Sequence, residues 1–355
     1  MMKKLNRKIR MPKYYSNEVV FRGHPDKVCD QISAAILKQA MAQDKNTRAG
    51  IEVVGGKRKI FITGEMTTKA VVNVIQVAKT ALINAGYDPK KYVFFNNIGR
   101  QSLDIAQGVD VGGAGDQGMM FGYACDDTPE LLPTAMVILQ KFAIAYDRLR
   151  KQQPDVFYPD GKAQITGFYD KNFKLKYIKD FVISYQNNEQ DRKYSDVVVK
   201  DMANRICKEY GIEVHNFWIN PTGKFLKGGF DADAGLTGRK IVVDAYQSFA
   251  NVGGGCMNGK DPTKVDFSAA HKARELAKRF LKRFHLKWCE VQLSYSIGLS
   301  QPLAIYIDSN KGQIRLPEAE YASLYDECTP KNIIKDLKLD KIDYVDLACF
   351  GHFRG

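Results

Sequence analysis

Two kinds of apolar spacing alternate along this chain. Between residues 28 and 41, apolar side chains recur on one face with the 3.6-residue period of a helix. Two short apolar runs follow, and with Gly55–Gly56 between them they predict a β-hairpin. The same two patterns continue toward the C-terminus. They predict strands at 49–54, 59–63, 92–98, 163–169 and 175–184, and helices at 67–85, 131–152 and 196–210.

The order of these elements predicts the fold class. Strands that arrive in hairpins with helices between them favour an α+β fold over a doubly wound parallel sheet. A length of 355 residues is enough for two or three domains. Residues 99–118 are rich in Gly, Asp and Gln with little periodicity, so we expect a functional loop there. We expect residues 1–13 to be a disordered basic leader, because no apolar core follows them as in a secretory signal.

The formal net charge of +13 permits two interpretations, a nucleic-acid surface or an enzyme with an anionic small substrate. The densest basic run, 272–287, carries Leu276, Phe280 and Phe284 at helical spacing, which is typical of an amphipathic helix with a solvated face. The sequence contains no nucleic-acid-binding motif and no apolar run long enough to span a bilayer. We therefore expect neither a nucleic acid nor a membrane as a partner.

The seven cysteines include no CxxC pair, which predicts free thiols in a reducing, cytoplasmic compartment. Cys256 lies in a glycine-rich loop and is the thiol that we expect to be most reactive.

The segment 220–266 concentrates glycine turns, paired basic side chains and spaced aspartates. Polyphosphate binding needs these three ingredients together: closely approaching backbone N–H groups, cations, and carboxylates that hold a divalent metal. Spacing alone leaves the metal and ribose roles of the aspartates interchangeable. The candidates in this segment are Asp233, Arg239, Lys240, Lys260, Lys264 and Asp266.

Two earlier strings could also carry chemistry. GHPDK at 23–27 supplies an imidazole, a carboxylate and an ammonium group at a helix start, which is a favourable place for phosphate. The plainer alternative is a helix end that Asp26 caps. Glu52 and Glu65 lie on the two arms of the predicted hairpin, where a carboxylate needs a cation if it is buried and needs none if it faces solvent.

Glycines also surround Asp116 in GGAGDQG at 112–118, where they would permit a close backbone approach. This string is not the GxGxxG fingerprint that follows a strand, and the chain has no P-loop motif, so neither of those nucleotide folds is expected. Asp160 and Lys162, in PDGKAQ, could add one more acid–base pair.

Together these strings resemble the S-adenosylmethionine synthetase (methionine adenosyltransferase) family. GHPDK, GAGDQG and GKDPTKVD, in this order, are its most specific motifs, and the resemblance extends from about Tyr15 to His352. It implies three similar α+β domains around a pseudo-threefold axis, and active sites between the two subunits of a dimer that pairs into tetramers in some members. The implied domains are 14–104, 113–228 and 229–355, interleaved along the chain, and 105–112 belongs to the loop that gates the site.

The resemblance implies a single displacement without a covalent enzyme intermediate. The sulfur of L-methionine attacks C5′ of ATP and releases the triphosphate, which is then cleaved to phosphate and pyrophosphate. Such a reaction asks the protein mainly to position its substrates and to stabilise charge on the leaving chain. That demand agrees with a set of candidates that is rich in cations and carboxylates. The implied catalytic residues are His24, Lys162, Arg239 and Lys260.

The resemblance also assigns the contacts of each substrate and ion. The implied ATP contacts are His24, Asp160, Lys162, Lys224, Phe225, Asp233, Arg239, Lys240, Cys256 and Lys260. The implied methionine contacts are Glu65, Gln101, Asp116, Asp233, Lys260 and Lys264. Two Mg²⁺ ions per site would be held by Asp26 and Asp266, with Glu18 as a further candidate ligand, and one K⁺ ion by Glu52.

Some positions depart from the family pattern. Arg22 stands where a glutamate is usual, and Asn187 replaces a histidine. Leu103 replaces a proline in a shortened gating loop, and Phe230 and Ala232 replace a proline and a glycine. The chain is therefore identified as a divergent member of bacterial type.

Two other hypotheses stay open. One is a triphosphate-handling enzyme with a changed acceptor, or a triphosphatase whose transfer step has decayed. The other is a nucleic-acid or regulatory binder that keeps only the fold, although binding alone gives no reason to retain both metal aspartates and the lysines.

Overall fold

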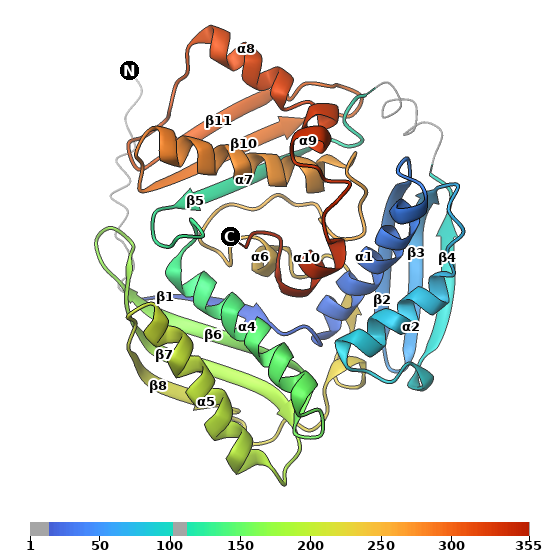
Figure 1. The fold of residues 1–355 in the computed structure, drawn as a ribbon, viewed down its shortest axis with the longest axis vertical. Helices are drawn as coiled ribbons and strands as arrows, with labels where there is room; N and C mark the ends of the chain where they lie inside the picture. The colour runs from blue at the N-terminus through green and yellow to red at the C-terminus, as the bar shows by residue number, and fades with distance from the viewer. Residues whose placement is uncertain (1–13, 102–111, 355) are drawn as a thin grey trace, which may run out of the picture.

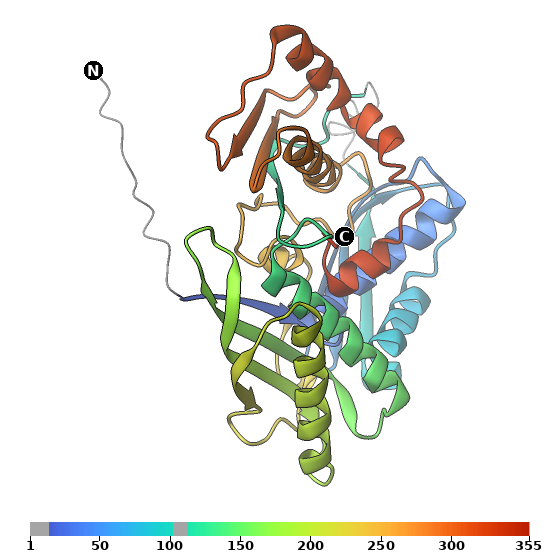
Figure 2. The same ribbon diagram turned by 60° about the vertical axis from the view of Figure 1, so that its left-hand side comes forward.

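Three β-sheets surround the centre of the molecule in the computed structural model, which describes residues 14–101 and 112–354 (Figure 1). Each sheet carries helices on one face, and in Figure 1 these helices lie toward the viewer. The turned view in Figure 2 shows the same layering from the side. The architecture is therefore α+β, as the sequence predicts. The expected leader and nearly all of the gating loop at 105–112 lie outside the described residues.

The first sheet has the strand order β4-β3-β2-β9 and is covered by helices α1 and α2. Its hairpin strands β2 and β3 are antiparallel, whereas β3 and β4 are parallel. The strands are β2 (Arg48–Gly56), β3 (Lys59–Thr67), β4 (Val93–Gly99) and β9 (Gly235–Leu236), and the helices are α1 (Pro25–Gln43) and α2 (Val74–Ala85). A short 3₁₀ turn, η1 (Pro89–Lys91), precedes β4.

The second sheet has the order β1-β6-β7-β8, with helices α4 and α5 on one face. Its strand β1 comes from the start of the described chain, far in sequence from the other three. The strands are β1 (Tyr14–Val20), β6 (Phe157–Tyr169), β7 (Leu175–Asn187) and β8 (Val214–Ile219), and the helices are α4 (Thr134–Gln152) and α5 (Arg192–Glu209).

The third sheet has the order β11-β10-β5, and helix α7 packs across β5 and β10. Its elements are β5 (Gly118–Cys125), β10 (Trp288–Tyr295), β11 (Ala304–Ser309), α7 (Val265–Arg283), α8 (Glu318–Glu327) and α9 (Pro330–Asp336). Two short helices, α6 (Ile241–Asp244) and α10 (Tyr344–Phe350), lie between the sheets in Figure 1, and the 3₁₀ turn η2 (Gly229–Asp231) precedes β9. Each sheet thus draws one strand from a distant stretch of sequence.

The core lies between each sheet and its helices, because successive strand residues point to opposite faces. On β3, Ile60 and Ile62 are fully buried against the helices, whereas Phe61 between them is 46% exposed on the other face. The first and third sheets share one hydrophobic core, and the second sheet has its own. No helix in the described part of the chain combines the length and the hydropathy needed to cross a membrane.

The hairpin forms as predicted, but its turn lies two residues later than Gly55–Gly56. Lys57 and Arg58 make the turn with φ angles of 45° and 68°, which suits a two-residue hairpin loop. Gly55 belongs to β2, and its lack of a side chain makes room for the ring of Phe230, because a Cβ would come within 2.3 Å of a ring carbon.

The helix predicted at 67–85 begins later, at Val74, where Asn73 accepts a hydrogen bond from the backbone N–H of Gln76. The preceding residues are extended or looped, because β3 continues to Thr67 and the side chain of Asp44 holds the N–H of Lys69. Gly86 ends this helix in the left-handed conformation, as predicted.

Candidate active site

His24 caps the N-terminus of α1 and is itself a candidate catalytic group. Its Nδ1 atom accepts the backbone N–H of Asp26 at 3.2 Å, so Asp26 is not the cap, and the alternative drawn from the sequence is wrong. Burial and the positive charge of Lys240 lower the pKa of His24 to about 4. The neutral ring then carries its proton on Nε2, because Nδ1 acts as an acceptor. Within the described part of the chain, no group accepts a hydrogen bond from Nε2–H.

Asp26 connects the start of α1 to the segment that follows β9. Its Oδ1 atom accepts the backbone N–H of Leu236 at 2.9 Å, and its Oδ2 atom accepts a hydrogen bond from Lys240 at 2.5 Å. The guanidinium of Arg239 lies 3.7 Å from Oδ1. Burial acts to raise the pKa of Asp26, but the bonds from Lys240 and Leu236 outweigh it and lower the pKa, so the carboxylate is ionised.

Glycine makes these close approaches possible. A Cβ at Gly235 would come within 2.3 Å of the carbonyl oxygen of Pro25, and a Cβ at Gly23 would come within 2.5 Å of backbone atoms of Pro159. A larger residue at either position would push α1 away from its neighbours. The strings GHPDK, PDGK and DAGLTGRK, far apart in sequence, therefore meet at one place.

Asp160 is buried at this meeting point, where its Oδ2 atom accepts the backbone N–H of Gly229 at 2.7 Å. Burial raises the pKa of Asp160 to about 6. Lys162, two residues further along β6, is exposed and acts electrostatically on His24, as does Asp233. We call this group the histidine cluster: His24, Asp26, Asp160, Lys162, Asp233, Arg239 and Lys240.

A cavity of about 430 Å³ opens beside the histidine cluster. Arg239 and Lys240 line it together with Glu18 and Gln164, which are register partners on β1 and β6. The structure therefore places Glu18, the further candidate magnesium ligand, in the same cavity as two of the predicted phosphate-binding cations.

A second group of predicted residues gathers at the other end of β2. Glu65 accepts hydrogen bonds from Lys264 at 3.0 Å and from Gln101 at 3.3 Å. Lys260 donates a hydrogen bond to Asp266. Burial acts to lower the pKa of Lys260, but Asp266 and, more weakly, Asp116 raise it. We call this group the glutamate cluster: Glu65, Gln101, Asp116, Lys260, Lys264 and Asp266.

The two clusters lie at different places along β2. The histidine cluster adjoins Val54 and Gly55, where β9 pairs with β2, whereas Gly50 is opposite Glu65 and bridges to Lys260. At a rise of about 3.3 Å per residue, these positions are roughly 13–16 Å apart. Among the described residues, no hydrogen bond or ion pair joins a member of one cluster to a member of the other.

Glu52 lies between the two clusters on β2 and is half-buried. Burial raises its pKa, and Lys260 opposes the shift. Within the described residues Glu52 forms no ion pair. A carboxylate without a fixed cationic partner fits a monovalent cation such as K⁺.

Neither cluster could hold magnesium with its own side chains alone, but each offers a carboxylate that could act together with substrate phosphates. The described residues contain no group of three or more His, Cys, Asp and Glu side chains that could hold a metal by themselves. Mg²⁺ needs only one or two carboxylates when substrate phosphates complete its ligands. Asp26 and Asp266 are the carboxylates for which the sequence predicts this role. A Cβ at Gly255 would come within 2.0 Å of the carboxylate carbon of Asp266, so the space beside this aspartate is kept open.

Three predicted ATP-contact residues lie outside both clusters. Lys224 is exposed and pairs with Glu189 at 2.8 Å, and Phe225 next to it is half-buried. Cys256 packs against Gly238. Burial raises the pKa of the Cys256 thiol, which disfavours the reactive thiolate that we expected from its glycine-rich loop.

Two departures from the family pattern have local partners. Arg22 pairs with Asp147 of helix α4 at 3.3 Å and donates to Gln31 of helix α1 at 2.9 Å. Asn187 is buried and donates to the hydroxyl groups of Tyr185 and Ser195 at 3.3 and 3.4 Å. Neither side chain contacts the two clusters.

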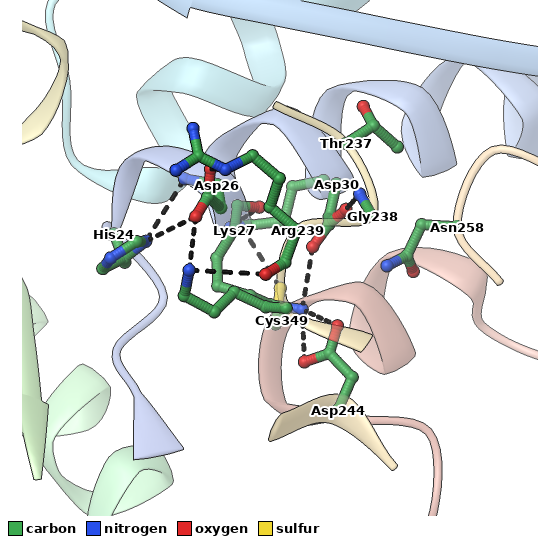
Figure 3. Close-up of polar contacts among 12 residues, drawn as sticks. His24, Asp26, Lys27, Asp30, Thr237, Gly238, Arg239, Asp244, Asn258 and Cys349 are labelled. Atoms are coloured by element: carbon green, nitrogen blue, oxygen red, sulfur yellow. Dashed lines mark hydrogen bonds and ion pairs between the residues drawn. The ribbon is translucent and has the colours of Figure 1, made fainter. Parts of the chain in front are cut away.

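Sequence reasoning missed the roles of Lys27, Asp30 and Asp244. Lys27 is 1% exposed, yet its ammonium group is held by both carboxylates (Figure 3). The only signal in the sequence is the i, i+3 spacing of Lys27 and Asp30 on α1, which is common on solvated helix faces.

Comparison with known proteins gives matches over nearly the whole chain. Family models for the N-terminal, central and C-terminal domains of S-adenosylmethionine synthetase match residues 12–106, 111–225 and 227–355. The chain is 38% identical over 355 residues to the S-adenosylmethionine synthase of Fusobacterium nucleatum subsp. nucleatum. It is 39% identical over 366 residues to that of Desulfosudis oleivorans. Both matches cover 96% of this chain and 92% of the relative.

Proposed function

Because this chain belongs to the S-adenosylmethionine synthetase family, which forms S-adenosylmethionine from methionine and ATP, we propose that its two clusters bind the two different substrates of this reaction. The chain is a methionine adenosyltransferase, an enzyme with metal-dependent catalysis. In our proposal the histidine cluster of one subunit binds the ATP triphosphate. The glutamate cluster of a second subunit binds methionine opposite it.

The observation that carries this proposal is the separation of the clusters along β2. The sulfur of methionine must come within van der Waals reach of C5′ before it can attack. The two clusters are anchored at backbone positions roughly 13–16 Å apart along one strand, which favours binding of the two substrates by clusters of different chains. A closed two-fold dimer would place the glutamate cluster of each subunit against the histidine cluster of the other.

The outward faces of the sheets support such a dimer. Phe61 and Phe95 stack on the first sheet with ring centroids 4.4 Å apart, and they are 46% and 41% exposed. Trp218 on the second sheet and Met119 on the third are exposed in the same way. Apolar side chains repeated over three sheet faces are typical of a subunit interface. Further pairing into tetramers, as in some family members, is part of the proposal.

The histidine cluster suits a departing triphosphate. As the S–C5′ bond forms, the C5′–O bond breaks and negative charge develops on the leaving oxygen. The neutral ring of His24 can donate Nε2–H to that oxygen, and Lys162, Arg239 and Lys240 supply positive charge around it. A water molecule then cleaves the bound triphosphate to phosphate and pyrophosphate. Asp160 and Asp233 contact the nucleoside, with Lys224, Phe225 and Cys256 at its margin.

The glutamate cluster suits an amino acid. Glu65 can accept from the amino group of methionine, and Lys264 can pair with its carboxylate. Gln101, Asp116 and Asp233 complete these contacts, while Lys260 reaches toward both substrates. Asp26 and Asp266, with Glu18 nearby, would hold two Mg²⁺ ions, and Glu52 would hold one K⁺ ion. Bound magnesium neutralises charge on the triphosphate oxygens. All seven cysteines are free, which supports a cytoplasmic site for the reaction.

Product analysis by mass spectrometry tests this function. Purified protein with ATP, L-methionine, Mg²⁺ and K⁺ should form S-adenosylmethionine, phosphate and pyrophosphate, and omission of any component should abolish or strongly reduce the product. Lys162→Met should lose most of the activity while staying folded. Phosphate and pyrophosphate from inorganic triphosphate without any S-adenosylmethionine from ATP would instead identify a triphosphatase.

A further inference from the structure

Lys27 is an unusual buried cation next to the proposed metal ligand Asp26. Its side chain is 1% exposed, and lysine is almost never buried this completely unless it is paired. The Nζ atom donates to both carboxylate oxygens of Asp244 at 2.7 and 2.6 Å and to Oδ2 of Asp30 at 3.2 Å (Figure 3). Burial acts to lower the pKa of Lys27, but the two aspartates raise it, so the ammonium group is charged.

The two aspartates of this triad lie on either side of the phosphate-binding cations. Asp30 accepts the backbone N–H of Gly238 at 2.9 Å through its second oxygen, directly before Arg239. Asp244 ends the short helix α6, which begins directly after Lys240. Asp30 thus contacts the start of the segment that carries Arg239 and Lys240, and Asp244 lies at its end. Both aspartates pair with Lys27.

Asp26 and Asp30 act in parallel. They are one helical turn apart on α1 and therefore share a face. Asp26 accepts the N–H of Leu236, and Asp30 accepts the N–H of Gly238 two residues later. One face of α1 thus holds the backbone N–H groups of Leu236 and Gly238. The contact with Gly238 depends on the orientation of Asp30, which its pairing with Lys27 fixes.

Stability alone gives no reason for such a triad. Replacing buried ion pairs by well-packed apolar side chains is often neutral or stabilising, whereas losing one partner is costly. The triad also reaches beyond α1, because the backbone carbonyl of Asp244 accepts the N–H of His352 at 2.8 Å and ties in the C-terminal segment. These contacts fix direction and register, which charge placement in an active site requires.

We propose that Lys27, Asp30 and Asp244 are positioning residues, which hold Asp26, Arg239 and Lys240 in the arrangement that binds the triphosphate of ATP. This inference rests on the proposed role of the histidine cluster. It adds a function for three residues that contact no substrate in that proposal.

Asp30→Asn tests the triad with little change in volume. The amide oxygen can keep the Gly238 contact only if the NH₂ group turns toward the ammonium of Lys27, so one of the two contacts is lost. We expect the KM for ATP, and for inorganic triphosphate in the hydrolysis reaction, to rise about tenfold or more, because a hydrogen bond to a charged group is lost. The KM for methionine should change by less than about twofold, because the glutamate cluster is untouched.

Glu327→Gln provides a matched control. Glu327 pairs with Lys272, another lysine that is 2% exposed, but this pair lies between α7 and α8, away from the Arg239–Lys240 segment. The control should lower the melting temperature without changing either KM. A purely structural role of the triad would make Asp30→Asn behave in the same way, with less active enzyme and unchanged KM values, and that result would overturn the proposal.

A second measurement covers the case in which Asp30→Asn does not fold. Asp244→Asn keeps the Lys27–Asp30 pair and should give the same rise in KM for ATP. In the unaltered enzyme without substrates, hydrogen exchange should be slow at the amides of Leu236 and Gly238. Exchange at these two amides as fast as in exposed loops would contradict the proposal without any variant.

The outcomes separate the two levels of inference. No S-adenosylmethionine from the unaltered enzyme counts against the proposed function itself. If that enzyme is active but Lys240→Ala keeps a normal KM for ATP, the histidine cluster is wrongly assigned. If Lys240→Ala is impaired and Asp30→Asn is normal, only the triad proposal fails.

Discussion

Gly255 leaves room for the carboxylate of Asp266, since a Cβ at residue 255 would come within 2.0–2.2 Å of all three carboxylate atoms. The two residues belong to different elements, a glycine-rich loop and the first turn of α7. Asp266 is held on its other side by Lys260. The position of this proposed magnesium ligand therefore depends on the absence of a side chain eleven residues earlier.

Gly255→Ala should consequently disable the site with little effect on folding. The added methyl group must displace Asp266, and a small misplacement of a catalytic group can cost about 100-fold in rate. We expect kcat/KM to fall by about that factor and the required Mg²⁺ concentration to rise. Gly254→Ala is the matched control, because no atom of residues 14–101 or 112–354 lies within 4 Å of its added Cβ. Similar kinetics for the two variants would contradict the close contact.

Asp160→Asn should raise the free energy of unfolding at high pH but weaken the binding of ATP. Burial raises the pKa of Asp160 from 3.8 to about 6, so the folded protein binds this proton more tightly than the unfolded chain. The ionised group therefore destabilises the fold above about pH 6, and this cost disappears as the pH falls toward 4. At pH 8 the variant should be more stable by about 1–3 kcal/mol, and at pH 4 the difference should vanish.

The same variant should have a higher KM for ATP, because it lacks the carboxylate proposed to contact the nucleoside. Chemical denaturation at several pH values, together with steady-state kinetics, checks both effects. A variant that is less stable than the unaltered protein at pH 8 would show that the Asp160 carboxylate is well accommodated when charged.

Phe61→Glu should separate the subunits. The side chain stacks on Phe95 on the outward face of β3, and a buried charge at an interface costs several kcal/mol. We expect monomers by analytical ultracentrifugation and loss of S-adenosylmethionine synthesis. Ile83→Glu alters another exposed apolar residue, on α2 at the helix side of the same sheet, and should leave both properties unchanged. A fully active Phe61→Glu monomer would rule out a site shared between subunits.

Local chemistry made much of this architecture predictable. The α+β class, the hairpin and the Gly86 helix stop follow from periodicity and backbone preference, because these are local properties. The start of α2 was predicted too early, since the side chain of Asp44 recruits the loop at Lys69 through a contact that no local pattern reveals.

The site was predictable as a set of residues but not as an arrangement. Motifs named the members of both clusters, yet their separation depends on which strand residues oppose one another, such as Gly50 opposite Glu65 and Val54 opposite Leu236. Lys27 illustrates the same limit. Its sequence neighbours allow a solvated lysine, and only the tertiary fold brings Asp244, at the end of α6, to its ammonium group.

Mixing two inactive variants tests the central claim, that each active site combines the histidine cluster of one subunit with the glutamate cluster of another. Lys240→Ala disables the first cluster and Asp266→Asn the second. When both are co-expressed, each mixed dimer contains one intact site and one doubly damaged site. With random pairing, S-adenosylmethionine synthesis should recover to about one quarter of the unaltered activity. The mixed dimer can be purified through two different tags. If it is as inactive as each variant alone, the active site is not shared between subunits and the central claim is wrong.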